Sequence, residues 1–343
     1  MTPAPNGAPR DENDLEERLS RPSPSLPSLL ARIAGDIIIL GAGGKMGPSL
    51  TRMARRAAPE RRIIAVSRWT DVHQADDLAQ LDVEIVRADL LDPRAVAALP
   101  DAPNVVFMAG QKFGTSDSPA ATWAMNAAVP AFVSERYAGA RTVVFSTGNV
   151  YPLTVPAVGG ACETDAPQPI GEYAYSCLAR ERLFTAAASR HGTPVAIVRL
   201  NYAHDLRYGV LTDLAMRIAG GEPVNLGMSF VNVMWQGDAN ALALAALAHA
   251  AAPQPYIVNV AGPDILRVAD LARSLGSRLD VQPIFAGEET TSALLSNASR
   301  MTTLTGDPLL PLDTLLDWTA AWVLAGGRLL GKPTGFERRD GRF

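Results

Sequence analysis

The chain has 343 residues, of which 48% are hydrophobic and 19% charged, and its formal net charge at pH 7 is −4. This composition is ordinary for a soluble globular enzyme and excludes disorder of the whole chain. The small negative charge provides no general basic field, which argues against nucleic acid as a partner, and no apolar run reaches the roughly 18 residues of a membrane helix.

Side chains that bind metals are sparse. The only cysteines are Cys162 and Cys177, and neither they nor the four scattered histidines have the spacing of a metal site. We therefore expect no metal, and so few thiols fit the reduced cytoplasmic compartment. Lysine occurs only at Lys45, Lys112 and Lys332, and every other cationic side chain is arginine.

In chain order, residues 1–34 come first and are rich in proline, serine and charge. We expect an arm that is mobile or lies on the surface, with a short helix over residues 11–19. Residues 35–200 are expected to form a dinucleotide-binding domain. Residues 201–330 then supply mainly substrate-binding segments, some returning to the sheet. Residues 331–343 form a tail, and its basic end, residues 338–343, is expected to be solvated.

The first strand and the glycines after it organise the chain. Residues 37–40 form an apolar run of three isoleucines and a leucine, which predicts a buried parallel strand, and the glycines that follow predict a tight turn into a helix. Gly41 permits the turn, Gly44 lets the backbone approach a pyrophosphate, and Gly47 lets the helix pack closely on the strand. A plain strand–helix turn is the alternative. The free N–H groups of the helix favour phosphates, so the predicted cofactor-binding residues are Gly41, Gly44, Lys45, Met46 and Gly47.

The end of the second strand, residues 61–66, bears on the choice of cofactor. NAD sites place an acid there for the ribose hydroxyl, whereas NADP sites place an arginine near the 2′-phosphate. This chain has Ser67 and Arg68, with no acid before Asp71. A hydroxyl beside a guanidinium suits a phosphate, although Arg68 also fits an ordinary surface position. The sequence therefore favours NADP over NAD.

Two further strands are expected at residues 83–86 and 104–110. Asp89, followed by Leu90, comes after the first of them and is a candidate acceptor for an adenine amino group; the alternative is that Asp89 caps the next helix. The other strand ends at Ala109 and Gly110, where a cofactor can lie against bare backbone. The loop that follows, residues 111–119, lies at the carboxyl edge of the sheet, where open α/β folds bind ligands.

The remaining elements complete an α/β pattern. We expect a helix over residues 122–137, strands at 141–145 and 194–200, and a helix from residue 171 between these strands. Beyond residue 200 strands and helices mix less regularly. The fold class predicted is a doubly wound parallel sheet (Rossmann) with a smaller C-terminal substrate-binding lid.

The chain resembles the extended short-chain dehydrogenase/reductase superfamily, the NAD(P)-dependent epimerase/dehydratase family, over residues 35–325. The matching motifs are Gly41-x-x-Gly44-x-x-Gly47, Asp89-Leu90, Ser146-Thr147 before Val150-Tyr151, Tyr173-x-x-Ser176 with Glu181, Arg199-Leu200-Asn201-Tyr202, Asp238, and Asn259-Val260-Ala261-Gly262. This resemblance implies that Thr147 holds the substrate oxygen and that Tyr173 shuttles its proton. Tyr175 competes for the second role, but choosing it puts Ser176 and Glu181 out of register.

One position departs from the family. The resemblance implies a lysine four residues after Tyr173, where it would bind the nicotinamide ribose and acidify the phenol, but this chain has Cys177. A neutral thiol contributes no positive charge, so we hypothesise that Lys112 or Arg180 replaces the missing cation. A nucleophilic role for Cys177 is disfavoured, because no general base stands beside it.

Evidence about the substrate is thinner. Nucleotide-sugar members of the family usually place an arginine just before the strand corresponding to residues 230–233, whereas residues 226–230 here contain no basic residue. The sequence therefore favours a small free sugar, a sugar acid or a related polyol. The candidate substrate contacts are Lys112, Asn126, Asn149, Asn201, His204 and Arg207.

The sequence thus predicts an NAD(P)-dependent oxidoreductase or epimerase that acts on a small carbohydrate by Tyr-assisted hydride transfer. The alternative is an NAD(P)-binding sensor or scaffold that lost turnover together with its lysine. Dimers through a helix pair are common in the family, so a homodimer is an expectation of the resemblance.

Overall fold

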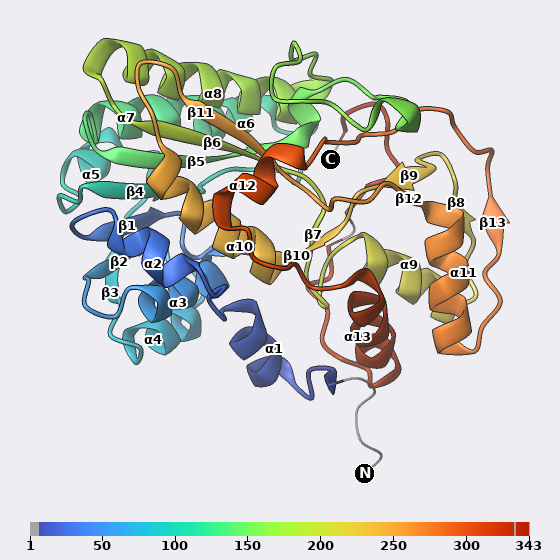
Figure 1. Ribbon diagram of the computed structural model, residues 1–343. Helices are drawn as coiled ribbons and strands as arrows, with labels where there is room; N and C mark the ends of the chain where they lie inside the picture. The colour runs from blue at the N-terminus through green and yellow to red at the C-terminus, as the bar shows by residue number, and fades with distance from the viewer. Residues whose placement is uncertain (1–6, 333, 343) are drawn as a thin grey trace.

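The computed structural model describes residues 7–332 and 334–342. At its centre lies a parallel sheet of seven strands in the order β11-β6-β5-β4-β1-β2-β3 (Figure 1), which confirms the predicted α/β fold class. The strands are β1 (Ile37–Leu40), β2 (Ile63–Ser67), β3 (Glu84–Arg87), β4 (Asn104–Phe107), β5 (Arg141–Thr147), β6 (Val195–Leu200) and β11 (Tyr256–Val260).

The sequence of β1 explains its central place. All of its residues are buried, because β2 pairs with it on one side and β4 on the other, with Ile37 opposite both Ile63 and Asn104. Ile39 faces one core of the protein, whereas Ile38 faces another on the opposite side of the sheet. A parallel strand that is buried on both faces needs such a continuous apolar run.

Helices cover both faces of the sheet, as Figure 1 shows. Those on one face are α2 (Leu26–Ala31), α3 (Gly47–Ala57), α4 (Val72–Ala79) and α10 (Gln236–Ala245). Those on the other are α5 (Pro93–Ala97), α7 (Val129–Arg136) and α8 (Gly171–His191). The helix predicted over residues 122–137 is interrupted, because a π-helical turn, η2 (Ala124–Ala128), separates α6 (Pro119–Trp123) from α7.

A third core lies beyond the sheet, toward the right-hand side of Figure 1. Its helices are α9 (Val210–Ala219), α11 (Val268–Leu279) and α13 (Leu312–Leu324). Short strand pairs accompany them: β9 (Phe230–Val231) with β12 (Leu266–Arg267), and β8 (Val224–Asn225) with β13 (Phe285–Ala286). The remaining short elements are β7 (Ala203–His204), β10 (Met234–Trp235) and α12 (Thr302–Thr305).

The two ends of the chain pack against the third core. The short helix expected over residues 11–19 is present as α1 (Glu12–Leu19), and it buries Leu15 and Leu19 completely in this core, so the described part of residues 1–34 is anchored on the protein. The basic end of the tail is mostly solvated, as expected, since Arg338, Asp340 and Arg342 are exposed, but the tail is anchored just before it. Phe336 is buried in the same core, and the Asp213 carboxylate accepts hydrogen bonds from the amide and hydroxyl of Thr334 at 2.8 and 2.6 Å.

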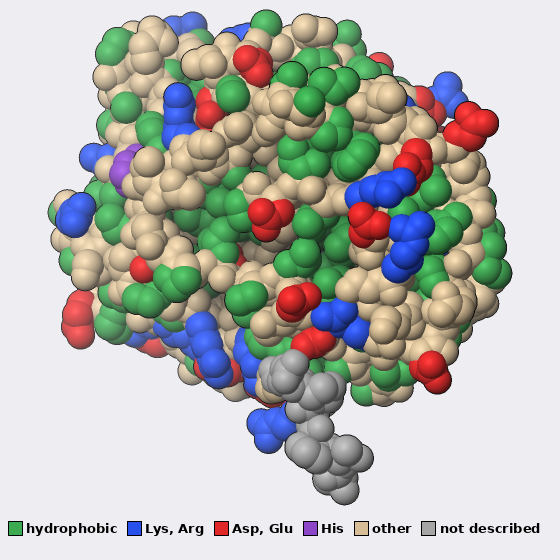
Figure 2. Space-filling model, turned by 45° about the vertical axis from the view of Figure 1, so that its right-hand side comes forward, with side chains coloured by type: hydrophobic (Ala, Val, Ile, Leu, Met, Phe, Trp, Pro, Cys, Tyr) green, Lys and Arg blue, Asp and Glu red, His purple; other side chains and the backbone are tan. Residues whose placement is uncertain are grey.

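The face drawn in Figure 2 carries hydrophobic side chains together with acidic and basic ones that lie beside each other, without a field of one sign. In the portion of the chain that is described, no helix combines the length and apolar character needed to cross a membrane. The described residues also contain no cluster of three or more metal-binding side chains.

Candidate active site

A cavity of about 1120 Å³ opens at the carboxyl edge of the sheet. Its walls come from the segments that follow strands β1, β4, β5 and β6, which is where open α/β sheets bind ligands. The predicted site residues that line it are Gly41, Gly44, Lys45, Met46, Arg68, Gly110, Lys112, Thr147, Asn149, Tyr173, Asn201 and Arg207. Those that do not line it are Gly47, Ser67, Asp89, Leu90, Ala109, Asn126, Cys177 and His204.

The glycine turn at the cavity fits a dinucleotide phosphate. Gly41 has φ +97°, and a Cβ there would lie 2.6 Å from the amide nitrogen of Ala109. A Cβ on Gly47 would lie 2.2 Å from the carbonyl oxygen of Ala42, so only glycine lets α3 begin so close to β1. No side chain caps the start of α3 at Met46. The first backbone N–H groups of this helix therefore suit an anion.

One part of the cavity lies next to the end of β2. Arg68 is exposed and lines the cavity, and Ser67 packs against Gly43, where a Cβ would lie 2.6 Å from the serine Oγ. Two carboxylates in the lining are already engaged. Asp71 caps α4, and Asp77 lies 3.6 Å from Arg52. The positive charge of Arg68 is thus not neutralised by a carboxylate at the end of β2.

The alternative role considered for Asp89 is wrong. The residue that caps α5 is Asp92, which accepts a hydrogen bond from the amide of Arg94. Asp89 is exposed and accepts from the amide of Leu91 at 3.0 Å. Its proposed contact with adenine stays a prediction.

Two hydroxyls meet at the wall of the cavity. Thr147 ends β5, Tyr173 lies in the first turn of α8, and their side chains are hydrogen-bonded to each other. The backbone N–H and Nδ2 of Asn149 both donate to the Thr147 hydroxyl oxygen, at 3.2 and 3.0 Å, which leaves the Thr147 O–H to donate. The competing Tyr175 is 53% exposed and does not line the cavity.

The electrostatics around Tyr173 favour the neutral phenol. Burial raises the pKa of Tyr173 well above its usual value, Cys177 adds to this, and the charge of Arg180 and the hydrogen bond with Thr147 oppose it. Burial also raises the pKa of Cys177, so the thiol is neutral at physiological pH. Cys177, at the position where the resemblance implies a lysine, therefore supplies no positive charge.

A buried ion pair between Glu181 and Arg199 lies next to this part of the site. The Arg199 guanidinium donates to both carboxylate oxygens of Glu181, from Nε at 3.0 Å and from Nη2 at 2.7 Å. The Ser146 hydroxyl donates to Glu181 at 2.6 Å, and Arg199 Nη1 donates to the Tyr151 hydroxyl oxygen at 2.6 Å. These contacts join β5, β6 and α8 just behind Thr147 and Tyr173.

The lining of the cavity contains many cationic side chains. All three lysines of the chain line this one cavity, and burial lowers the pKa of Lys45 and of Lys112 to about 8. Arg338 and Arg339 of the tail line it as well. These tail residues were missed, because the sequence shows only a short basic terminus with no sign of where it docks.

Arg339 changes the argument about the substrate. Its guanidinium donates to the backbone oxygen of Ser292 at 2.7 Å, to the hydroxyl of that serine at 2.7 Å, and to Thr290 Oγ1 at 3.2 Å. It also lies 3.4 Å from the carbonyl oxygen of Gly227. A basic residue therefore does reach residues 226–230, although it comes from the far end of the chain, so the lack of a basic residue within this stretch no longer argues against a diphosphate.

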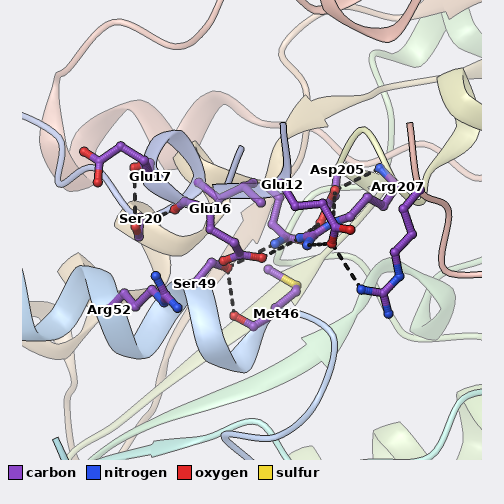
Figure 3. A network of polar contacts seen from close by, with 12 residues as sticks. Glu12, Glu16, Glu17, Ser20, Met46, Ser49, Arg52, Asp205 and Arg207 are labelled. Atoms are coloured by element: carbon purple, nitrogen blue, oxygen red, sulfur yellow. Dashed lines mark hydrogen bonds and ion pairs between the residues drawn. The ribbon is translucent and has the colours of Figure 1, made fainter. Parts of the chain in front are cut away.

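Helix α1 closes the cavity near the glycine turn. In Figure 3, Glu12 and Glu16 point from this helix toward Asp205 and Arg207. Arg207 Nη2 donates to Glu16 at 2.7 Å and to the buried Asp205 at 2.8 Å. Arg207 is thus largely occupied by the protein's own carboxylates.

Two other predicted substrate contacts lie elsewhere. His204 is fully buried with its Nε2 3.0 Å from Thr319 Oγ1, and burial lowers its pKa to about 3, so its predicted place in the cavity is wrong. Asn126 is fully buried behind the cavity wall. Asn201 does line the cavity, and its Nδ2 donates to the carbonyl oxygen of Leu294 at 3.3 Å.

Comparisons with known proteins agree with this geometry. The family model of the NAD dependent epimerase/dehydratase family matches residues 37–261. A search of the curated proteins finds no match. Among solved structures, MoeE5 in complex with UDP-glucose and NAD superposes with a TM-score of 0.69 at 19% identity, covering 85% of this chain and 99% of that one. The UDP-glucose 4-epimerase of Thermotoga maritima gives a TM-score of 0.70 at 16% identity, covering 85% and 99%. At these identities the structural likeness establishes the fold alone.

Proposed function

The chain belongs to the NAD-dependent epimerase/dehydratase family, and from this premise we propose that it is an NAD(P)-dependent oxidoreductase or epimerase of an anionic carbohydrate. The observation that carries the proposal is the hydrogen-bonded pair Thr147 and Tyr173 in the wall of the cavity that the glycine turn opens. We further propose that residues 35–200 hold the cofactor and that segments from 201–330, together with the tail, hold the substrate.

Thr147 and Tyr173 act on one substrate oxygen in this proposal. A nicotinamide cofactor at the glycine turn supplies a hydride acceptor or donor. Asn149 occupies the acceptor lone pairs of Thr147, so the Thr147 hydroxyl donates to the substrate oxygen and holds it beside Tyr173. Tyr173 then gives a proton to that oxygen or takes one from it. Because burial favours its neutral form, Tyr173 is ready to act as the acid.

The charge of the cavity supports an anionic substrate. Lys112, Lys332, Arg338 and Arg339 line it. A carboxylate or phosphate on the sugar is attracted by such cations, whereas a neutral sugar is not. MoeE5 was solved with UDP-glucuronic acid and NAD, and a UDP-glucuronic acid 4-epimerase has the same fold.

A substrate panel tests this function. The protein is incubated with NAD⁺ or NADP⁺ and with one sugar in four forms: neutral, uronic acid, phosphate and UDP conjugate. Reduced nicotinamide is followed by absorbance and epimers by chromatography. We expect turnover of one or more anionic forms and none of the neutral form. Tight cofactor binding without any turnover would instead favour the sensor or scaffold, an alternative motivated by Cys177 at the lysine position.

We propose that NADP is the preferred cofactor, because Arg68 is exposed at the end of β2 and no acid stands beside it. The expected result for Arg68→Ala is a loss of NADP⁺ affinity of about 10–100-fold, since hydrogen bonds to charged groups contribute about 1.5–3 kcal/mol. The affinity for NAD⁺, which lacks the 2′-phosphate, is expected to change little. Calorimetric titration with both cofactors measures the difference.

Arg87→Ala is the matched control for this prediction. Arg87 is exposed at the end of β3, opposite Ser67 in the pairing with β2, but it does not line the cavity. Equal losses for NAD⁺ and NADP⁺ in the Arg68 variant, or a similar loss in the Arg87 variant, contradict the assignment.

A further inference from the structure

Arg180 lies on the helix that carries Tyr173 and Cys177, three residues after the second and seven after the first, so all three side chains share one face of α8. Arg180 as a whole is only 5% exposed. A Cβ on Gly110, which lines the cavity, would lie 2.6 Å from Arg180 Nη2. The positive charge therefore sits directly behind the cavity wall.

This charge is buried without a carboxylate partner. Among the described residues Arg180 forms no ion pair, and its two hydrogen bonds go to neutral oxygens, the Phe145 carbonyl at 2.7 Å and Asn126 Oδ1 at 2.8 Å. Its Nε has no hydrogen-bond partner at all. The neighbouring Glu181 is committed to Arg199. The guanidinium also lies 5.6 Å from the ring centroid of Phe107. A buried cation whose partners are all neutral is costly, so a fold retains one where its field has a use.

We propose that Arg180 is a positioning residue that stabilises the Tyr173 phenolate across space, as the ammonium of a lysine at position 177 would do. This inference rests on the proposed role of Tyr173 as acid and base. When the phenol gives its proton to the substrate oxygen, a negative charge appears on Tyr173, and the fixed guanidinium favours that charge. The charge of Arg180 lowers the pKa of both Tyr173 and Cys177, against the larger effect of burial.

Asn126 holds the guanidinium in place. Besides accepting from Arg180, its Oδ1 accepts from the amide of Gln111 at 2.8 Å. Its Nδ2 donates to the Gln111 carbonyl at 2.9 Å and to Ser176 Oγ at 3.0 Å. Asn126 lies in the π-helical turn η2, and such turns are frequent at functional sites. The guanidinium is thereby fixed relative to the cavity wall and to the first turns of α8.

Lys112 is the other candidate cation, and the geometry gives it a different place. It lies in the loop after β4, with its Nζ 5.8 Å from the ring centroid of Phe113. The charge of Lys112 lowers the pKa of Cys177. Burial lowers the pKa of Lys112 itself to about 8, and the nearby charge of Asp213 opposes this shift. Glu181 is the remaining charged group that acts on Cys177. We assign Lys112 to the substrate.

The test measures the titration of Tyr173 in the full chain with cofactor bound. Tyrosine labelled with ¹³C at Cζ reports the phenolate by NMR, and the spectrum of Tyr173→Phe assigns the signal. The pH profile of kcat is recorded in parallel on the substrate found by the panel. In Arg180→Met we expect the pKa of Tyr173 measured by NMR to rise by about one unit or more. The limb of the pH profile of kcat that reflects the ionisation of Tyr173, called the Tyr173 limb below, is expected to move to higher pH by the same amount. Arg180→Lys is expected to move them less.

Asn126→Asp provides a second variant in case Arg180→Met fails to fold, as judged by thermal unfolding. It keeps the shape of the side chain but places a carboxylate against Arg180, which neutralises the field, so the limb is again expected to move to higher pH. Lys112→Met is expected to raise KM without moving the limb. An unmoved titration in Arg180→Met and Asn126→Asp, or a shift in Lys112→Met alone, would overturn the inference.

Failure of this inference and failure of the proposed function give different results. If Tyr173→Phe is inactive while the Arg180 variants keep the wild-type profile, only the role of Arg180 falls. If Tyr173→Phe keeps normal activity, the proposed function itself falls.

Discussion

Replacing Tyr173 by phenylalanine is expected to lower kcat by about 10²–10⁴-fold, the usual contribution of a positioned acid or base. The hydroxyl lies in the cavity wall with the Thr147 hydroxyl as its partner, and removing it takes away the group that exchanges the proton in this proposal. Cofactor affinity is expected to stay near the wild-type value, because the glycine turn is untouched. Steady-state kinetics with the substrate from the panel and calorimetry with the cofactor measure the two quantities.

Tyr175→Phe is the matched control for this experiment. It removes the same hydroxyl from the same helix, but Tyr175 is 53% exposed and does not line the cavity. Its kcat is expected to equal that of the wild type. A near-normal kcat in Tyr173→Phe, or similar losses in both variants, contradicts the assignment of the acid and base.

The largest effect on stability is expected from the buried pair Glu181 and Arg199. Both side chains are 3% exposed. In Glu181→Gln the guanidinium loses its counter-charge without leaving the interior, which typically costs about 3–5 kcal/mol of unfolding free energy. Urea unfolding followed by circular dichroism measures this loss.

Two comparisons make this prediction specific. The double variant Glu181→Leu/Arg199→Met removes both charges, so it is expected to cost less than the sum of the two single variants. Arg273→Ala breaks the exposed pair with Asp270, whose side chains are 57% and 63% exposed, and is expected to cost about 0–1 kcal/mol. A loss in Glu181→Gln as small as that in Arg273→Ala would show that the buried pair contributes nothing special.

The parts of the fold that sequence reasoning found depend on local requirements. The isoleucine run of β1 is needed because this strand is buried on both faces. Glycine is needed at position 41 because φ is positive there, and at position 47 because the backbone lies so close to Ala42. Such needs are visible in a few neighbouring residues. The same holds for Thr147 and Tyr173, whose motifs are short and lie next to a strand and a helix.

The parts that it missed depend on contacts between distant segments. Arg339 contacts Gly227, which is 112 residues away in the chain, and the side chain of His204 contacts Thr319, which is 115 residues away. No local sequence period or motif encodes such pairs. Sequence reasoning therefore predicted a solvated side chain for Arg339 and a substrate contact for His204. Arg207 does line the cavity as predicted, but its ion pair with Glu16 was missed for the same reason, because Glu16 belongs to the N-terminal helix.

The account as a whole requires a dinucleotide on the backbone amides of the first turn of α3. A crystal structure of the protein grown with NADP⁺ tests this most directly. We expect density for the pyrophosphate against residues 44–47, for the 2′-phosphate beside Arg68, and for the nicotinamide in the cavity next to Tyr173. Crystals that diffract well but show no dinucleotide at this turn, at saturating NADP⁺ and likewise at saturating NAD⁺, would contradict it.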